Sequence, residues 1–299
     1  MQKEQLTLLE QGQLRLIELM SVLPISWTSA IGHYLGKRSA KQAIRNGENW
    51  IQDIHKTLQH LRGIEDFKLR EQQIIEWTGR IGCLRTQFTI LQRLVQEGYL
   101  EVIGQENLQN ISQPTIFVSC HLAHWELVGH TLTRLPNRGC ALYAPLKNPI
   151  YEVIATRVRQ SWKTNTELVS ASPRAMFQLT RALKAGSNLL LFIDEEREGY
   201  IWGPSLGRKL PYAGNRWLAA RLAIRHQLDI VPCFVEQIDE FRYRVVIEPK
   251  LQRGNGDAES CARFLADQMD ERMDQWVRER LEQWYWLSWL DLDKPLPRF

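Results

Sequence analysis

The chain has 299 residues, of which 44% are hydrophobic, so it can bury the core of one large domain or of one domain with a helical appendage. Its five cysteines are irregularly spaced and include no CxxC pair, which argues against a disulfide framework and favours a reducing compartment. The formal charge of +4 and the lack of basic stretches interleaved with aromatic residues give no indication of nucleic-acid binding.

The first hundred residues are predicted to be helical. They begin with charged and polar residues at helical spacing rather than with the features of a signal peptide. Residues 19–36 contain no Lys, Arg, Asp or Glu and reach the lower limit of about 17 residues for a membrane span, but their serines, threonine, proline and histidine weaken that interpretation. We therefore interpret residues 1–100 as a helical, membrane-associating segment, with a helical hairpin on a bilayer or on the domain favoured over a true span.

From residue 101 onward, short apolar strands alternate with helices. Strands are expected in "TIFVSC", "GCALYAP", "NLLLFID", "DIVPCFVEQ" and "YRVVIEP", with helical patterns between the earlier ones. A last helix, expected over residues 257–290, is rich in tryptophan. This order predicts an α/β fold in residues 101–299, with a mostly parallel central sheet flanked by helices.

A cluster of titratable residues follows the first of these strands, in "FVSCHLAHWELVGHTL". His121 is expected where the carboxyl end of the strand meets the next helix, the place at which open α/β sheets bind ligands. Glu126 follows five positions later, in the first turns of that helix, so the two side chains can converge. A carboxylate bonded to one imidazole nitrogen fixes the tautomer and makes the other nitrogen a better base for a hydroxyl proton.

Several segments together resemble a known family. "HLAHWE" resembles the His-x4-Asp/Glu motif of the lipid A biosynthesis lauroyl/myristoyl acyltransferases, a lysophospholipid acyltransferase-like family that also includes mycobacterial phosphatidylinositol mannoside acyltransferases. Further segments resemble the family in the same order: "VIGQENL", "YAPLKNP" with "RVR", "LLLFIDEE", "GNRWLAARLAIRHQLDIVPCF" and "RLEQWYWLSW". The resemblance covers roughly residues 19–289.

This resemblance implies a glycerolipid acyltransferase-like core on the cytoplasmic side of the cell inner membrane. The implied reaction transfers a fatty acyl chain from acyl carrier protein or coenzyme A to a hydroxyl of a glycolipid or related amphiphile, without a cofactor or metal. His121 is implied as the general base and Glu126 as its partner. Arg159 and Asp194 match the family's arginine after the Asn-Pro helix and its strand-end aspartate, and are expected to bind substrate.

Other polar residues are further candidates for substrate binding. Arg159 and Arg216 can bind a developing oxyanion or a substrate phosphate. Asn148 belongs to the Asn-Pro segment. Four basic residues can face an anionic carrier protein, coenzyme A or anionic lipid: Lys147, Arg157, Arg208 and Lys209.

Four positions depart from the family pattern. Ala123 and His124 stand where glycine and asparagine are usual, Ala144 replaces an arginine, and Glu195 replaces the glutamine after the aspartate. These departures affect the identity of the expected substrate more than the type of reaction.

Other interpretations compete with acyl transfer. A metal-dependent hydrolase would use His121, His124, Glu126 and His130, but their spacing matches no HExxH or related zinc pattern. A serine hydrolase would use Ser205 in "GPSLG", which lacks the preceding strand and following helix of a nucleophile elbow. The chain can also be a noncatalytic lipid-binding homologue. Structural roles remain open for individual residues: a surface or packing position for the other histidines, packing for the late tryptophans, an exposed helix position for Arg159, and a turn or a salt bridge for Asp194.

Overall fold

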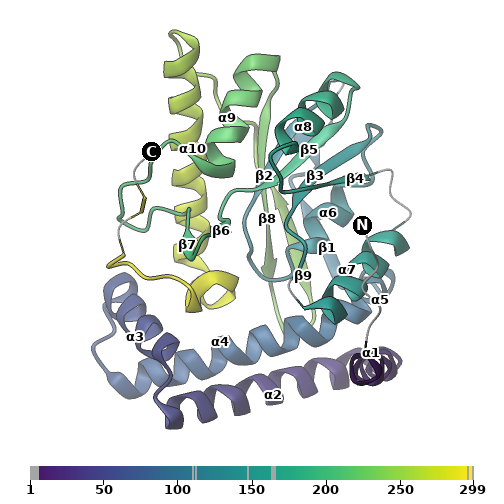
Figure 1. Cartoon of the computed structure of the whole chain (residues 1–299), viewed down its shortest axis with the longest axis vertical. Helices are drawn as coiled ribbons and strands as arrows, with labels where there is room; N and C mark the ends of the chain where they lie inside the picture. The colour runs from purple at the N-terminus through teal and green to yellow at the C-terminus, as the bar shows by residue number, and fades with distance from the viewer. Residues whose placement is uncertain are drawn as a thin grey trace.

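The computed structural model describes residues 7–109, 111, 113–146, 148–162, 166–294 and 296–297. In these residues a layer of N-terminal helices lies along one end of an α/β core (Figure 1). The core contains a seven-stranded sheet, and a separate two-stranded hairpin of β6 (Glu196–Arg197) and β7 (Tyr200–Ile201) follows the fifth strand.

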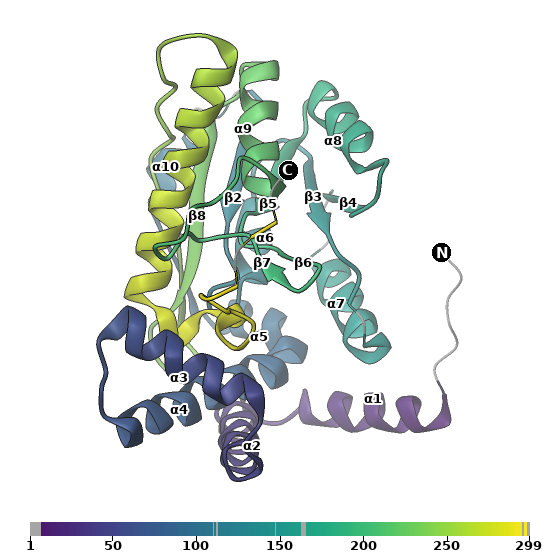
Figure 2. The ribbon, with the colours of Figure 1, turned by 60° about the vertical axis from the view of Figure 1, so that its left-hand side comes forward.

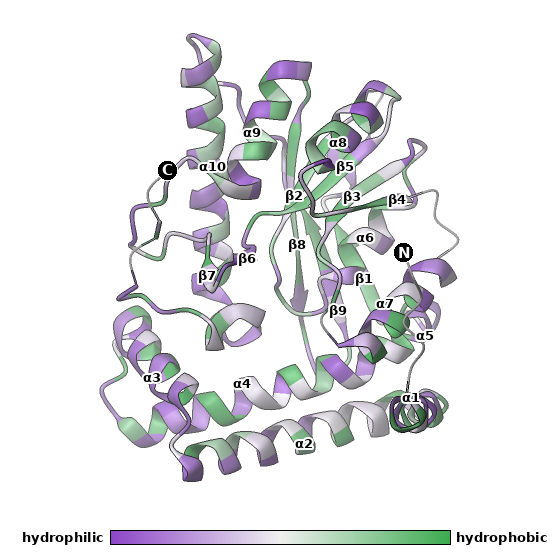
Figure 3. Ribbon diagram, in the orientation of Figure 1, coloured by the Kyte–Doolittle hydropathy of each residue, from purple (hydrophilic) through white to green (hydrophobic). Residues whose placement is uncertain are grey.

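The central sheet is mostly parallel, as the sequence predicts. Its strand order is β1-β9-β8-β2-β5-β3-β4, and β8 and β9 form its only antiparallel pair among the described residues. The strands span Leu100–Ile103 (β1), Ile116–Ser119 (β2), Gly139–Tyr143 (β3), Thr166–Ser170 (β4), Asn188–Phe192 (β5), Ile230–Gln237 (β8) and Tyr243–Ile247 (β9). Figure 3 shows β2, β5 and β8 as hydrophobic strands at the centre.

Helices cover both faces of the sheet because alternate side chains of a strand point to opposite faces. Phe117 and Leu190 pack with α6 (Glu126–Leu132) and α7 (Pro149–Ser161). Their neighbours Val118 and Leu191 instead pack in the cluster on the other face. The helices of that face are α8 (Ala175–Lys184), α9 (Gly214–His226) and α10 (Ala258–Glu279).

The N-terminal helices are α1 (Leu8–Met20), α2 (Ile25–Asn46), α3 (Asn49–Arg62), α4 (Phe67–Gln87) and α5 (Leu91–Gln96). α2 and α4 lie side by side (Figures 1 and 2), and glycines allow their close approach. A Cβ added at Gly36 would lie 2.2 Å from the carbonyl oxygen of Thr78, and one added at Gly82 would lie 2.2 Å from that of Gly32.

The prediction of a helical hairpin over residues 19–36 is wrong. This stretch contains the end of α1, a turn and the first half of α2, and the two helices cross rather than lie antiparallel (Figures 1 and 2). Pro24 lies at the N-terminal boundary of α2, where its fixed backbone angle starts a new helix in a new direction. None of the described helices combines the length and the hydrophobicity that a membrane crossing requires.

Candidate active site

A large cavity lies at the carboxyl ends of the central strands and continues along β3. Its volume is about 1730 Å³, and every residue of β3 contributes to its wall. α6 and α7 border it on one face of the sheet, and residues of α8 and α9 border it on the other. Parallel sheets commonly bind ligands at this edge.

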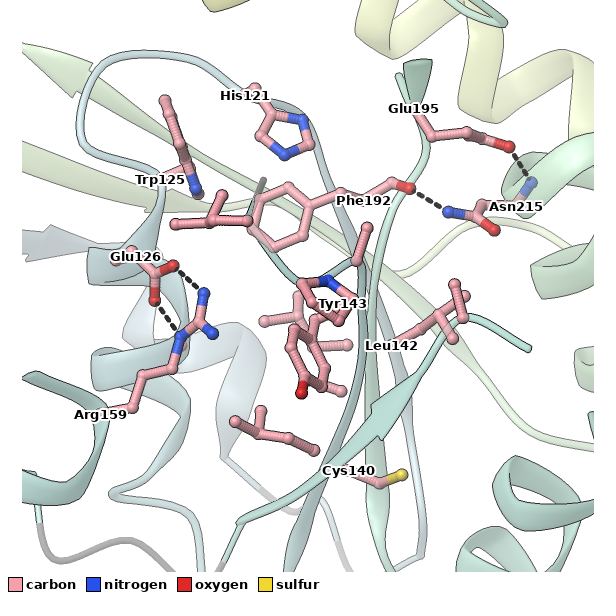
Figure 4. Close-up of a pocket in the computed structure, with 18 of the residues that line it drawn as sticks. His121, Trp125, Glu126, Cys140, Leu142, Tyr143, Arg159, Phe192, Glu195 and Asn215 are labelled. Carbon is pink, nitrogen blue, oxygen red and sulfur yellow. Dashed lines mark hydrogen bonds and ion pairs between the residues drawn. The ribbon is translucent and has the colours of Figure 1, made fainter. Parts of the chain in front are cut away.

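His121 lines this cavity in the loop after β2, at the strand end that the sequence predicts (Figure 4). Its Nδ1 lies 2.7 Å from Oδ1 of Asp194, and its backbone N–H donates to Oδ2 of the same carboxylate at 2.7 Å. Asp194 follows the parallel neighbour β5 and is completely buried. Because an ionised carboxylate only accepts hydrogen bonds, Nδ1 carries the proton and Nε2 is the basic nitrogen.

Aromatic rings surround the imidazole of His121. The ring centroids of Phe192, Trp125 and Trp286 lie 4.7, 5.0 and 5.3 Å from its own. Nε1 of Trp286 is also 3.2 Å from Nδ1, but the shorter contact with a charged acceptor places the Nδ1 proton on the Asp194 side. The rings limit the movement of the imidazole and leave its side chain 19% exposed.

Glu126 pairs with Arg159 instead of with His121, which corrects the expected partnership. Nε of Arg159 donates to Glu126 Oε2 at 3.0 Å, and Nη2 donates to Oε1, so the pair is bidentate (Figure 4). Burial acts to lower the pKa of Arg159, but the adjacent carboxylate outweighs it and raises that pKa. The physical reason for the different pairing is that Arg159 on α7 offers Glu126 a permanent charge and two parallel donors.

The family model of the bacterial lipid A biosynthesis acyltransferases matches residues 13–290. The chain belongs to this family. A comparison with curated proteins finds no match.

Among solved structures, this acyltransferase is similar to the crystal structure of the 1-acyl-sn-glycerophosphate (LPA) acyltransferase PlsC from Thermotoga maritima. The sequence identity is 11% and the TM-score is 0.37. The match covers 76% of this chain and 94% of that chain.

Of three further candidates for substrate binding, one lines the cavity. Asn148 lines the cavity of the acyltransferase and also caps α7, because its Oδ1 accepts the backbone N–H of Ile150 at 2.9 Å. Lys147 lies outside the described residues. Arg157 forms an ion pair with Glu18 of α1.

Arg216 does not point into the cavity, contrary to the sequence-based expectation. Its side chain is buried and donates to the carbonyl oxygens of Ala266 at 3.0 Å and Pro211 at 2.9 Å. It belongs to the face of α9 that packs on α10, whereas its neighbours Asn215 and Trp217 line the cavity. A helix turns by about 100° per residue, so a one-residue step changes the face completely.

The other histidines of the motif pack in the core. His124 stacks on Phe88 with 5.7 Å between ring centroids, and burial lowers its pKa to about 3. His130 is buried against Trp162.

Within the described ranges, no three His, Cys, Asp or Glu residues form a group that could hold a metal ion. Ser205 Oγ donates to Asp274 at 3.0 Å.

Glu195 is a half-buried residue at the edge of the cavity. One oxygen accepts the backbone N–H of Asn215 at 2.6 Å (Figure 4), while Oε2 is buried and has no partner among the described residues. Burial raises its pKa to about 7, from an ordinary value of 4.5. The sequence marks the position only as a departure from the family's glutamine.

Glu195→Gln should therefore make the stability of the protein less dependent on pH. The unfolded chain releases the Glu195 proton near pH 4.5 and the folded chain near pH 7, so the free energy of unfolding falls as the pH rises through this window. Glutamine keeps the shape and removes the titration, which should recover about 1 to 3 kcal/mol above the window. Urea unfolding of both proteins at about pH 5 and about pH 8 measures this effect. An identical pH dependence in the two proteins would show that Glu195 is ionised throughout.

Proposed function

We propose that this family member is an O-acyltransferase that moves a fatty acyl chain from acyl carrier protein or coenzyme A to a hydroxyl of a glycolipid or related amphiphile, as a lipid A secondary acyltransferase does. The observation that carries this proposal is the bond between His121 and the buried Asp194 beside the large cavity. This arrangement leaves the free imidazole nitrogen as a base for a hydroxyl.

The thioester carbonyl is already activated, so the protein needs only a base, a group that stabilises the oxyanion, and positioning. Nε2 of His121 takes the proton of the acceptor hydroxyl while the hydroxyl oxygen attacks the carbonyl carbon. The C–S bond of the tetrahedral intermediate then breaks, and the imidazolium returns the proton to the leaving thiolate. The products are an ester and a free thiol, and no covalent enzyme intermediate forms.

Arg159 is the cation that we assign to the oxyanion or to a substrate phosphate. It lines the cavity, and its guanidinium is fixed by Glu126 through Nε and Nη2. No acceptor among the described residues bonds Nη1, which leaves a donor for substrate. A fixed cation in a water-poor site stabilises developing negative charge without reorganisation.

The cavity is large enough for lipid chains. Typical small-molecule pockets occupy about 300 to 1,000 Å³, whereas this one has about 1730 Å³. Phe117, Gly129, Ala141 and Leu190 give it an apolar wall on the α6 and α7 side. The wall follows β3 from Tyr143 at its carboxyl end to the start of the strand, a depth of about 13 Å at the rise of a β-strand. We place the acyl chain of the donor here.

The test of this function uses the purified protein with radiolabelled acyl carrier protein and acyl-coenzyme A thioesters and a panel of glycolipid acceptors. A labelled ester that requires both substrates, detected by mass spectrometry, supports the proposal. Saturable binding of lipid without any ester would instead favour a noncatalytic lipid-binding homologue.

We also propose that the protein binds the cytoplasmic face of the inner membrane through α1 and the start of α2. Large apolar side chains are exposed on these helices and on the turn between them, and Figure 2 shows α1 projecting from the rest of the molecule. They are Leu8, Leu9, Leu16, Leu19, Val22, Trp27, Tyr34 and Leu35. Such a helix can lie in the plane of the lipid interface with its apolar side chains buried.

Replacing both Leu9 and Leu16 by aspartate should weaken binding to vesicles of phosphatidylethanolamine and phosphatidylglycerol. The two leucines lie two turns apart on α1 and are 74% and 62% exposed, so the change removes apolar area and adds charge repulsion without disturbing the core. Co-sedimentation with vesicles measures the binding. Phe177→Asp on α8, at a side chain that is 72% exposed, is the matched control and should bind normally. Unchanged binding of the double variant would remove α1 from the interface.

A further inference from the structure

The segment after α10 contacts the loop that carries His121. The predicted long C-terminal helix ends at Glu279, and two short 3₁₀ turns, Leu281–Gln283 and Tyr285–Ser288, follow. The backbone N–H of Ala123 donates to the carbonyl oxygen of Gln283, and that of Tyr285 donates to the carbonyl oxygen of His121, both at 2.9 Å. Leu122 and Trp284 thus form an antiparallel bridge between the two segments.

Trp284 reaches from this bridge to the carboxylate behind the base. Its indole is completely buried, and its Nε1–H donates to Oδ2 of Asp194 at 2.9 Å. The same oxygen accepts the backbone N–H of His121, while Oδ1 accepts Nδ1–H. Among the described residues, three donors fix this carboxylate, which has no exposure to water. Two of the donors belong to His121, and the third is the indole of Trp284.

The backbone of Trp284 is fixed from the opposite side. The carbonyl oxygen of Trp284 accepts Nε1–H of Trp77 on α4 at 2.9 Å, and Trp77 is itself buried. The backbone that carries the indole therefore cannot shift without breaking a second buried hydrogen bond. A buried donor or acceptor that loses its partner is costly, so this geometry is strongly determined.

We propose that Trp284 is a positioning residue for acyl transfer, whose indole N–H holds the Asp194 carboxylate in the orientation that bonds Nδ1 of His121. The proposal rests on the proposed function of His121 as the base. Without the N–H, the carboxylate can rotate and its negative charge is less stabilised. The tautomer of His121 becomes less well defined, and the imidazolium form is favoured more strongly by its neighbour.

Loss of this donor should lower kcat by about tenfold, the effect of one hydrogen bond to a charged group, with little change in the KM for the thioester. The acidic limb of the pH–kcat profile should move to higher pH, because the base keeps its proton up to a higher pH. Two variants test this: Trp284→Phe, and replacement of Trp284 by β-(3-benzothienyl)alanine through nonsense suppression. The second keeps the shape of the indole and exchanges only the N–H for sulfur, so it separates the hydrogen bond from packing.

Trp276→Phe is the matched control. Trp276 is 2% exposed, and its Nε1–H also donates to a carboxylate, that of Glu248, at 2.7 Å. This variant should lose stability without a change in kcat or in the acidic limb. Full activity and a normal pH profile in the benzothienylalanine protein would overturn the proposal, as would an equal loss of kcat in Trp276→Phe.

A second readout does not depend on turnover. In protein labelled with ¹⁵N-histidine, the Nδ1–H proton of His121 should give a low-field resonance that broadens or disappears in both Trp284 variants and persists in Trp276→Phe. If the wild-type protein forms no ester but shows this pattern, the proposed function fails while the positioning role of Trp284 stands. A resonance that is unchanged in the Trp284 variants would refute the positioning role.

Discussion

Replacing His121 by alanine should lower kcat for ester formation by about 10² to 10⁴, the usual contribution of a general base. The KM for the thioester should change little, because the lost interaction belongs to the transition state. Folding should survive, since the side chain borders the cavity and is not part of a hydrophobic cluster. Steady-state kinetics with labelled thioester, combined with circular dichroism, measure both effects.

His124→Asn is the control for this experiment within the same motif. His124 stacks on Phe88 in the core and does not line the cavity, so its replacement by the residue usual in the family should leave the chemical step intact. The assignment of the base would be wrong if His124→Asn were inactive and His121→Ala active.

Asp194→Asn should be impaired nearly as strongly, by about 10² to 10⁴. The amide keeps the size of the carboxylate and can still accept one pair of donors, from Trp284 and from the backbone of His121. It cannot stabilise an imidazolium by charge, and an amide NH₂ facing Nδ1 favours the wrong tautomer. The same kinetic assay and the ¹⁵N shifts of His121 measure the loss. A fully active Asp194→Asn protein would remove Asp194 from the mechanism.

Much of the fold is predictable from the sequence because the pattern of each buried element is local. The five predicted strands and the helices predicted between the first four of them are all confirmed, since apolar runs and helical periodicity determine them. The sequence pattern does not indicate the strands β1 and β4 at the two edges of the sheet. β4, "TELVS", has one buried residue, so it lacks the apolar run that indicates a central strand.

The candidate site is less predictable because its contacts join distant parts of the chain. The position of His121 follows from its strand, but the choice of Asp194 over Glu126 as its partner depends on the parallel pairing of β2 with β5. The bond between Arg159 and Glu126 likewise depends on how α6 and α7 meet. Only the strand-end position of Asp194 in "LLLFIDEE" offered a signal for its role, since adjacent parallel strands end at the same edge.

The division of the chain near residue 100 into a helical segment and a core stays a prediction. In the structure α5 ends at Gln96 and β1 begins at Leu100. One hydrophobic cluster nevertheless joins residues of both parts, including Ile54, Ile74 and Trp284. The N-terminal helices therefore pack against the segment that contacts the His121 loop.

A double-mutant cycle on kcat tests the central claim most directly, namely that His121 works with Asp194 while Glu126 works with Arg159. In the His121→Ala background, Asp194→Asn should cause no further loss, because the carboxylate acts only through the imidazole. Glu126→Gln should reduce kcat by the same factor in both backgrounds, because it acts through the orientation of Arg159. The opposite pattern, with Glu126→Gln silent and Asp194→Asn still harmful when His121 is absent, would contradict the account.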